Sequence, residues 1–108
     1  MKELTIDDLR TLCNDKDNVI VTQHTAYRFQ QRKINLNDVI CSINKGKIIE
    51  QYSNDYPYPS CLVLGPGLQD EFLHTVCAVG DNKLWLITSY IPTHEKWTDD
   101  FKVRKVDE

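Results

Sequence analysis

The hydrophobic pattern of this chain changes its period at Gly46, and this change limits the fold more than any other feature. Before it, Asn35 is placed to cap a helix that Gly46 ends in a left-handed conformation. The apolar residues of this helix follow the i, i+3, i+4, i+7 spacing: Leu36, Val39, Ile40 and Ile43. After Gly46 the period falls to two, and β-branched and aromatic residues predict strands.

Two further helices precede this one. Thr5 is a plausible N-cap for a short helix over residues 5–13, and Thr22 for a second helix over about 23–33. Ala26 and Phe29 mark the side of the second helix that we expect to face the core. An extended apolar piece, residues 19–21, lies between the two.

Four strands follow, and a tight GDNK turn joins the last two. Because consecutive short strands with short connections pair as neighbours, they predict an antiparallel meander. The expected fold is α+β: N-terminal helices packed on a curved antiparallel four-stranded meander. From Pro92 onward the chain is polar apart from Trp97, Phe101 and Val103, and we expect this part to dock loosely or to add one turn. The strands are predicted at residues 47–52, 60–65, 72–79 and 84–91.

The composition fits one domain spanning residues 1–108, with 41% hydrophobic and 27% charged residues. There is no run of 18 apolar residues, and the N-terminus MKELTIDDLR is charged where a signal peptide is apolar. We therefore expect a cytoplasmic protein without a membrane segment. The cysteines show no C-x-x-C pair, so we predict reduced, structural thiols and neither a metal nor another cofactor. They are Cys13, Cys41, Cys61 and Cys77.

The charge is uneven along the chain. The formal net charge is −3, yet residues 21–50 hold five Lys/Arg against two Asp/Glu. A general polyanion binder would be cationic overall, because counterion release from phosphates drives such binding. The distribution excludes that class and leaves room for a small local phosphate site.

The basic segment contains His24, Arg28 and Arg32, which share one face of the predicted helix. Two guanidinium groups can clamp a phosphate, and an imidazole can transfer a proton near neutral pH. On RNA, such groups allow a 2′-hydroxyl to attack its own phosphodiester without a metal. The alternative is a solvated basic face, which would suit a non-catalytic module that binds an acidic partner protein.

Further candidates lie on the strands. His74 interrupts apolar residues, either as a catalytic group or as a half-buried histidine bonded to a neighbour. Tyr90 is a possible second proton-transfer group. We also expect substrate contacts from hydroxyl and aromatic side chains at strand ends, namely Tyr58, Ser60 and Thr88.

The register of the last two predicted strands, which the GDNK turn joins, determines which of these candidates share a face of the sheet. If Val79 faces Leu84, then His74 faces Ser89 and Thr75 faces Thr88. His74 and Tyr90 then lie on opposite faces of the sheet, and so do His74 and Thr88, unless a bulge intervenes.

Several motifs in order resemble the bacterial domain-of-unknown-function family 4258. They are His24-x-x-x-Arg28-x-x-x-Arg32, the Asn-capped helix ending at Gly46, YPYPSCLVLG, a strand containing LH, and ITSYIP followed by Trp97. The resemblance covers about residues 21–97. It leaves residues 1–20 as an N-terminal helical extension and 98–108 as a C-terminal tail.

Members of that family resemble ribonuclease toxins of type II toxin-antitoxin systems, of the RelE, MqsR and BrnT type. The resemblance implies a RelE/barnase-like fold and a metal-independent endoribonuclease that cuts messenger RNA, free or on the ribosome. It carries over His24, Arg28, Arg32, His74 and Thr88 as site residues. It also implies a partner antitoxin, often one with a zinc-binding N-terminus and a helix-turn-helix. The net negative charge departs from the basic character of such toxins and fits ribosome-dependent cutting or a lost activity.

Overall fold

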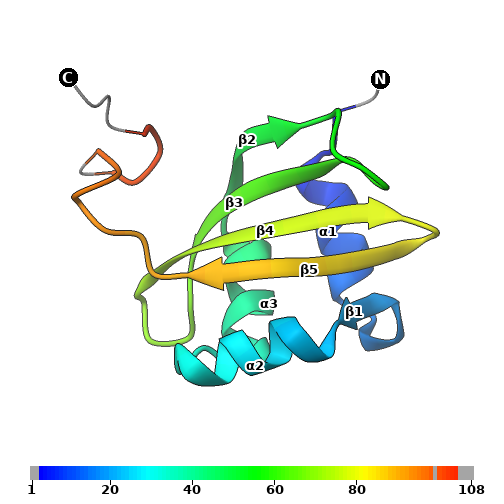
Figure 1. Cartoon of the computed structure of the whole chain (residues 1–108), viewed down its shortest axis with the longest axis horizontal. Coiled ribbons are helices and arrows are strands. Elements are labelled where there is room, and N and C mark those ends of the chain that lie inside the picture. The colour runs from blue at the N-terminus through cyan, green and yellow to red at the C-terminus, as the bar shows by residue number, and fades with distance from the viewer. Residues whose placement is uncertain (1–2, 99, 105–108) are drawn as a thin grey trace.

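The computed structural model describes residues 3–98 and 100–104, which form three α-helices and one five-stranded sheet (Figure 1). The α+β class is confirmed. The predicted tail, 98–108, lies partly outside the described residues, as do residues 1–2 of the N-terminal extension. The helices are α1 (Ile6–Cys13), α2 (Gln23–Gln31) and α3 (Leu36–Lys45), with a 3₁₀ turn at Lys16–Asn18. The strands are β1 (Val19–Val21), β2 (Lys47–Tyr52), β3 (Ser60–Pro66), β4 (Phe72–Gly80) and β5 (Lys83–Tyr90).

All three helices begin at the predicted caps. The Thr5 hydroxyl accepts from the Asp8 amide at 3.1 Å, and the Thr22 hydroxyl accepts from the Thr25 amide at 3.2 Å. Asn35 forms a capping box with Asp38, whose carboxylate also accepts from the Leu68 amide at 3.0 Å. Local side-chain chemistry therefore sets each helix start, and Asp38 ties α3 to the loop between β3 and β4.

The predicted left-handed stop at Gly46 is wrong, because Gly46 is extended with φ −101° and ψ −164°. Glycine is needed there for close packing instead. A Cβ on Gly46 would lie 2.3 Å from the Leu64 carbonyl oxygen, and a Cβ on Gly65 would lie 2.0 Å from the Ser42 carbonyl oxygen. The end of α3 thus meets β3 backbone to backbone. The left-handed residue after a helix is Lys33, with φ 58°, at the end of α2.

The sheet has the order β1-β5-β4-β3-β2, so it contains one strand more than the predicted meander. The piece predicted only as extended, β1, pairs in parallel with β5, Val19 opposite Leu84. This pairing provides hydrogen-bond partners for backbone groups at the edge of β5, which a four-stranded sheet would leave unpaired. The other pairs are antiparallel, and Asp81 and Asn82 are both left-handed in the predicted hairpin turn.

The helices cover one face of the sheet, and this layer holds the main core: Leu9, Phe29, Val39, Ile43, Val63, Leu73, Cys77 and Leu84. Ala26 was expected to face the core but is exposed. Thr25 is buried beside Phe29, because its hydroxyl donates to the Ile87 carbonyl of β5 at 3.1 Å. All four cysteines are free, and Cys13, Cys61 and Cys77 are buried.

The N-terminal extension is part of this packing. Arg10 of α1 donates from Nε to the Ile43 carbonyl at 3.2 Å and from Nη2 to the Gly46 carbonyl at 2.9 Å. These bonds satisfy carbonyl groups that the end of α3 leaves without a helical partner. None of the helices described is long and apolar enough to cross a lipid bilayer.

Candidate functional site

A β-bulge decides which side chains meet on the outer face of the sheet, the face away from the helices. Val79 pairs with Leu84 as predicted, but beyond Cys77 the register shifts by one residue. His74 therefore pairs with Tyr90 and Thr75 with Ser89, so the predicted pairs in this half are wrong. The shift falls where β1 ends and α2 takes over the edge of β5. Its consequence is that His74 and Tyr90 share one face.

The bulge brings an imidazole and a phenol into a fixed hydrogen-bonded pair. His74 is fully buried, and its Nε2 lies 2.8 Å from the Phe101 carbonyl oxygen. Since a carbonyl only accepts, Nε2 carries the proton, and Nδ1 must accept from the Tyr90 hydroxyl, 3.1 Å away. Burial lowers the pKa of His74 and outweighs the Phe101 carbonyl, which favours the charged ring. The ring is therefore a neutral acceptor.

The segment after β5 covers this pair, and in Figure 1 it leaves the end of β5 at the left of the view. Trp97 meets His74 edge-on, with ring centroids 4.2 Å apart, and the Arg104 guanidinium lies 4.7 Å from the Trp97 ring. Arg104 also makes two 3.2 Å bonds to the Glu50 carboxylate on β2. Packing and charge together hold the segment on the sheet.

Glu50 is the anionic centre of this arrangement. Burial alone would raise the pKa of Glu50, but hydrogen bonds from Tyr52 and Arg104 outweigh it and hold the pKa below its usual value. Burial and the bond to Glu50 raise the pKa of Tyr52 to about 12. Glu50 is therefore charged at neutral pH and serves to position Arg104.

A cavity of about 450 Å³, the Tyr90 cavity, opens beside the pair. Burial raises the pKa of Tyr90, so its hydroxyl keeps its proton at neutral pH. Lys96 and Arg104 bring two cations to the same wall and Glu95 brings one carboxylate, so the lining keeps a net positive charge. Such a cavity can bind an anion against a proton-transfer group. Its lining residues are Tyr90, Ile91, Thr93, Glu95, Lys96, Trp97 and Arg104.

Of the predicted site residues, four gather at the end of β5. His74 and Tyr90 form the pair above, and Arg32 donates from Nη1 to the Thr88 hydroxyl at 3.0 Å and to the Ser89 carbonyl at 2.9 Å. The charge of Arg32 also acts on Tyr90, where it opposes the rise in pKa. Arg32 therefore adds a third cation near the Tyr90 cavity.

The other predicted residues lie elsewhere. His24 and Arg28 are exposed on α2, and within residues 3–98 and 100–104 the side chain of neither makes a hydrogen bond or an ion pair. Tyr58 packs against Trp85 near the opposite end of β5, with ring centroids 5.7 Å apart. Ser60 is buried and donates to Asp55.

Sequence reasoning missed Glu50, Lys96 and Arg104. Glu50 and Tyr52 are two positions apart on β2, so the sequence pattern could have indicated two polar groups on one strand face. Lys96 and Arg104 lie in a polar segment without periodicity, so the local sequence carries no signal of their position.

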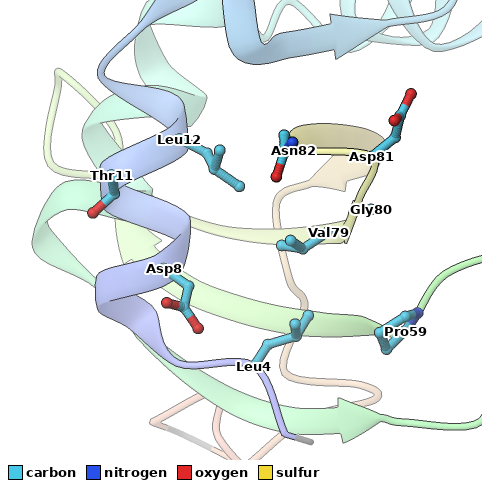
Figure 2. Close-up of a pocket in the computed structure, with 9 residues that line it drawn as sticks. All are labelled: Leu4, Asp8, Thr11, Leu12, Pro59, Val79, Gly80, Asp81 and Asn82. Atoms are coloured by element: carbon cyan, nitrogen blue, oxygen red, sulfur yellow. The ribbon is translucent and has the colours of Figure 1, made fainter.

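A second cavity shows by contrast why the charge of its lining makes the Tyr90 cavity the better candidate for a phosphate site. The second cavity has a volume of about 500 Å³. It lies between α1 and the β4–β5 hairpin (Figure 2). Asp8 and Asp81 put two carboxylates on its wall, and no cation lines it. It does not suit a phosphate. Across the described ranges, no cluster of His, Cys, Asp or Glu could hold a metal ion.

Comparison with known proteins identifies one family. No curated protein and no solved structure matches this chain. A family model matches residues 12–91, which include His74 and Tyr90 and end before Trp97. The match starts earlier and ends earlier than the predicted 21–97. Since it covers most of the 108 residues, the chain belongs to the family described as Domain of unknown function (DUF4258).

Proposed function

We propose that this protein is an endoribonuclease that cleaves RNA by attack of a ribose 2′-hydroxyl on the adjacent phosphodiester. The observation that carries the proposal is the fixed tautomer of His74. The Phe101 carbonyl holds the proton on Nε2, so Nδ1 is ready to accept the proton of Tyr90, which lines a cationic cavity. This is the arrangement of a nucleophile or base activated by an oriented imidazole.

In the proposed reaction, Tyr90 takes the proton of the 2′-hydroxyl while its own proton passes to His74 Nδ1. The 2′-oxygen forms a bond to phosphorus, and the bond from phosphorus to the 5′-oxygen breaks. Arg104 and Arg32 stabilise the negative charge on the phosphate, and the Lys96 ammonium donates a proton to the departing 5′-oxygen. The products are a 2′,3′-cyclic phosphate and a 5′-hydroxyl. Side chains supply every proton transfer, so the step requires no metal.

The biological setting that we propose is a type II toxin-antitoxin system, with messenger RNA as substrate, free or on the ribosome. Helices on one face and a polar site on the other fit a RelE/barnase-like toxin. The partner that we propose is an antitoxin with a zinc-binding N-terminus and a helix-turn-helix. The net charge of −3 favours ribosome-dependent cutting over general RNA affinity.

The test is an RNA cleavage assay with and without ribosomes, in the presence of a chelator. We expect new 5′-hydroxyl ends from the wild type and a loss of at least about 100-fold in rate for Tyr90→Phe, the size of a general acid–base effect. Tyr27→Phe is the matched control, because Tyr27 is an exposed tyrosine on α2. Equal rates for Tyr90→Phe and the wild type, or no cleavage by the wild type under either condition, would contradict the proposal.

A second candidate function is a non-catalytic module that binds an acidic segment of a partner protein. The observation in its favour is the exposure of His24 and Arg28 on one helix face. The two functions separate when RNA cleavage and binding of the acidic partner protein are both measured, because the module cleaves no RNA. Arg28→Glu should abolish binding in the module, whereas Tyr90→Phe should leave it intact.

A further inference from the structure

A groove on the outer face, lined by aromatic residues, is the strongest feature that the reaction does not use. We propose that it binds a guanine base of the RNA substrate, a few nucleotides from the cleaved phosphate. This inference rests on the proposed function and specifies its substrate. The groove has a volume of about 310 Å³, and Asp55, Tyr56, Tyr58, Trp85 and Ile87 line it. We call it the aromatic groove.

The floor of the aromatic groove is a rigid stacking surface. The rings of Tyr58 and Trp85 lie 5.7 Å apart at 31°. The Trp85 indole N–H donates to the Gly80 carbonyl at 3.0 Å, so the indole offers only its ring to a ligand. The Tyr58 ring lies directly over Gly80, where a Cβ would come within 2.0 Å of it. A planar base can stack on a surface that is already formed.

The wall of the groove exposes apolar surface. Tyr56 is 95% exposed and Ile87 is 47% exposed. Proline-rich peptides also bind aromatic grooves, but they do so with a tryptophan N–H donating to a peptide carbonyl. That donor is already used in this protein. The surface therefore favours a ligand that is held by its ring face.

Asp55 gives the groove a preference among the bases. Its Oδ2 accepts from the buried Ser60 hydroxyl, which fixes the carboxylate, while Oδ1 has no donor among the residues that the structure describes. Guanine presents two neighbouring N–H donors, N1 and N2, on its Watson–Crick edge. A carboxylate can accept both, whereas adenine and uracil offer no such pair.

The bulge places the aromatic groove and the Tyr90 cavity on one face. Trp85 pairs with Ala78 and Tyr90 pairs with His74, and both partners lie on the outer face of β4. Trp85 and Tyr90 are five positions apart on β5, roughly 16 Å along a strand. A few nucleotides of single-stranded RNA span this distance, so one strand can fill both sites.

The test uses short 2′-O-methyl oligonucleotides, which cannot be cleaved, and follows tryptophan fluorescence. We expect a guanine-containing oligonucleotide to bind about tenfold more tightly than its inosine counterpart, which lacks the N2 amine. Asp55→Asn should remove this difference, and Asp81→Asn, on the exposed hairpin turn, should keep it. Tyr56→Ala should weaken binding of every base about tenfold without affecting stability, because Tyr56 is 95% exposed.

The outcomes separate the subsite from the reaction. Guanine-selective binding by a protein that cleaves no RNA would support the subsite and overturn the Tyr90 chemistry. Cleavage whose base preference is unchanged by Asp55→Asn and Tyr56→Ala would overturn the subsite and leave the chemistry standing. Quenching by a proline-rich peptide, with none by any oligonucleotide, would also overturn the subsite.

Discussion

His74 is held on three sides: one ring nitrogen faces a carbonyl oxygen, the other faces a phenol, and Trp97 packs against the ring. A lone histidine in an apolar strand is often only a satisfied buried group. The feature that distinguishes this one is that its hydroxyl partner lines a cavity with Lys96 and Arg104. The same burial predicts how stability depends on pH.

Because burial lowers the pKa of His74, the unfolded chain takes up a proton at about pH 6.5 while the folded chain does not. The stabilisation is present in full above that pH and is lost as the pH falls toward the lower pKa of the folded state. We expect the urea midpoint to fall on acidification in this window, and to fall less steeply for His74→Gln. His24→Gln, which removes an exposed imidazole, should keep the wild-type slope. Equal slopes for His74→Gln and the wild type would show that His74 does not control this transition.

At the scale of elements, the helices were predictable and the sheet edge was not. Thr5, Thr22 and Asn35 cap helices through bonds three residues away, so local sequence contains the signal. The pairing of β1 with β5 is different, because three apolar residues show no period and their partner lies more than sixty positions away. The bulge lies directly beyond the end of that pairing, and a one-residue shift reverses every side chain beyond it.

The end of α2 offers a stabilising change. Lys33 is left-handed, and the Ile34 amide donates to the Phe29 carbonyl at 2.9 Å, as in a Schellman motif. Lys33→Gly should raise the free energy of unfolding by about 0.5–1 kcal/mol, because glycine adopts this conformation without strain. Urea unfolding measures the effect. Lys33→Ala keeps a Cβ at this position, so it should bring no comparable gain; a gain as large as that of glycine would contradict the explanation.

The contact between α3 and β3 should tolerate no added atom. Gly65→Ala places a Cβ 2.0 Å from the Ser42 carbonyl, and we expect a loss of about 1–3 kcal/mol or more in the free energy of unfolding. Gly67→Ala is the matched control, since its nearest neighbour is the end of the flexible Glu71 side chain. Thermal unfolding of both variants checks this. Similar melting temperatures would mean that the two backbones can separate at low cost.

The candidate site combines residues from the regular elements α2, β2, β4 and β5 with residues from the irregular segment after β5. Sequence patterns predicted His74, Tyr90, Arg32 and Thr88 as site residues, because each is a polar residue in a periodic element. They could not identify Lys96 and Arg104, whose positions depend on tertiary packing of an aperiodic segment. The family match also ends at residue 91, before this segment begins.

The segment that carries Trp97 should therefore stabilise the entire domain. Trp97 is 2% exposed and packs on His74, so Trp97→Ala should lower the free energy of unfolding by about 3–5 kcal/mol. Val103→Ala, at a position that is 59% exposed, should change it by no more than about 0.5 kcal/mol. Equilibrium denaturation measures both. A small effect of Trp97→Ala would indicate that the sheet is stable without the packing of the segment after β5.

The position of Phe101 and Arg104 along the chain has a consequence for truncation. Both residues follow the last of the five strands, and they orient His74 and hold the segment after β5 on the sheet through Glu50. A polypeptide cut directly after Tyr90 would therefore keep the residues of all five strands, while its imidazole would lack a carbonyl partner.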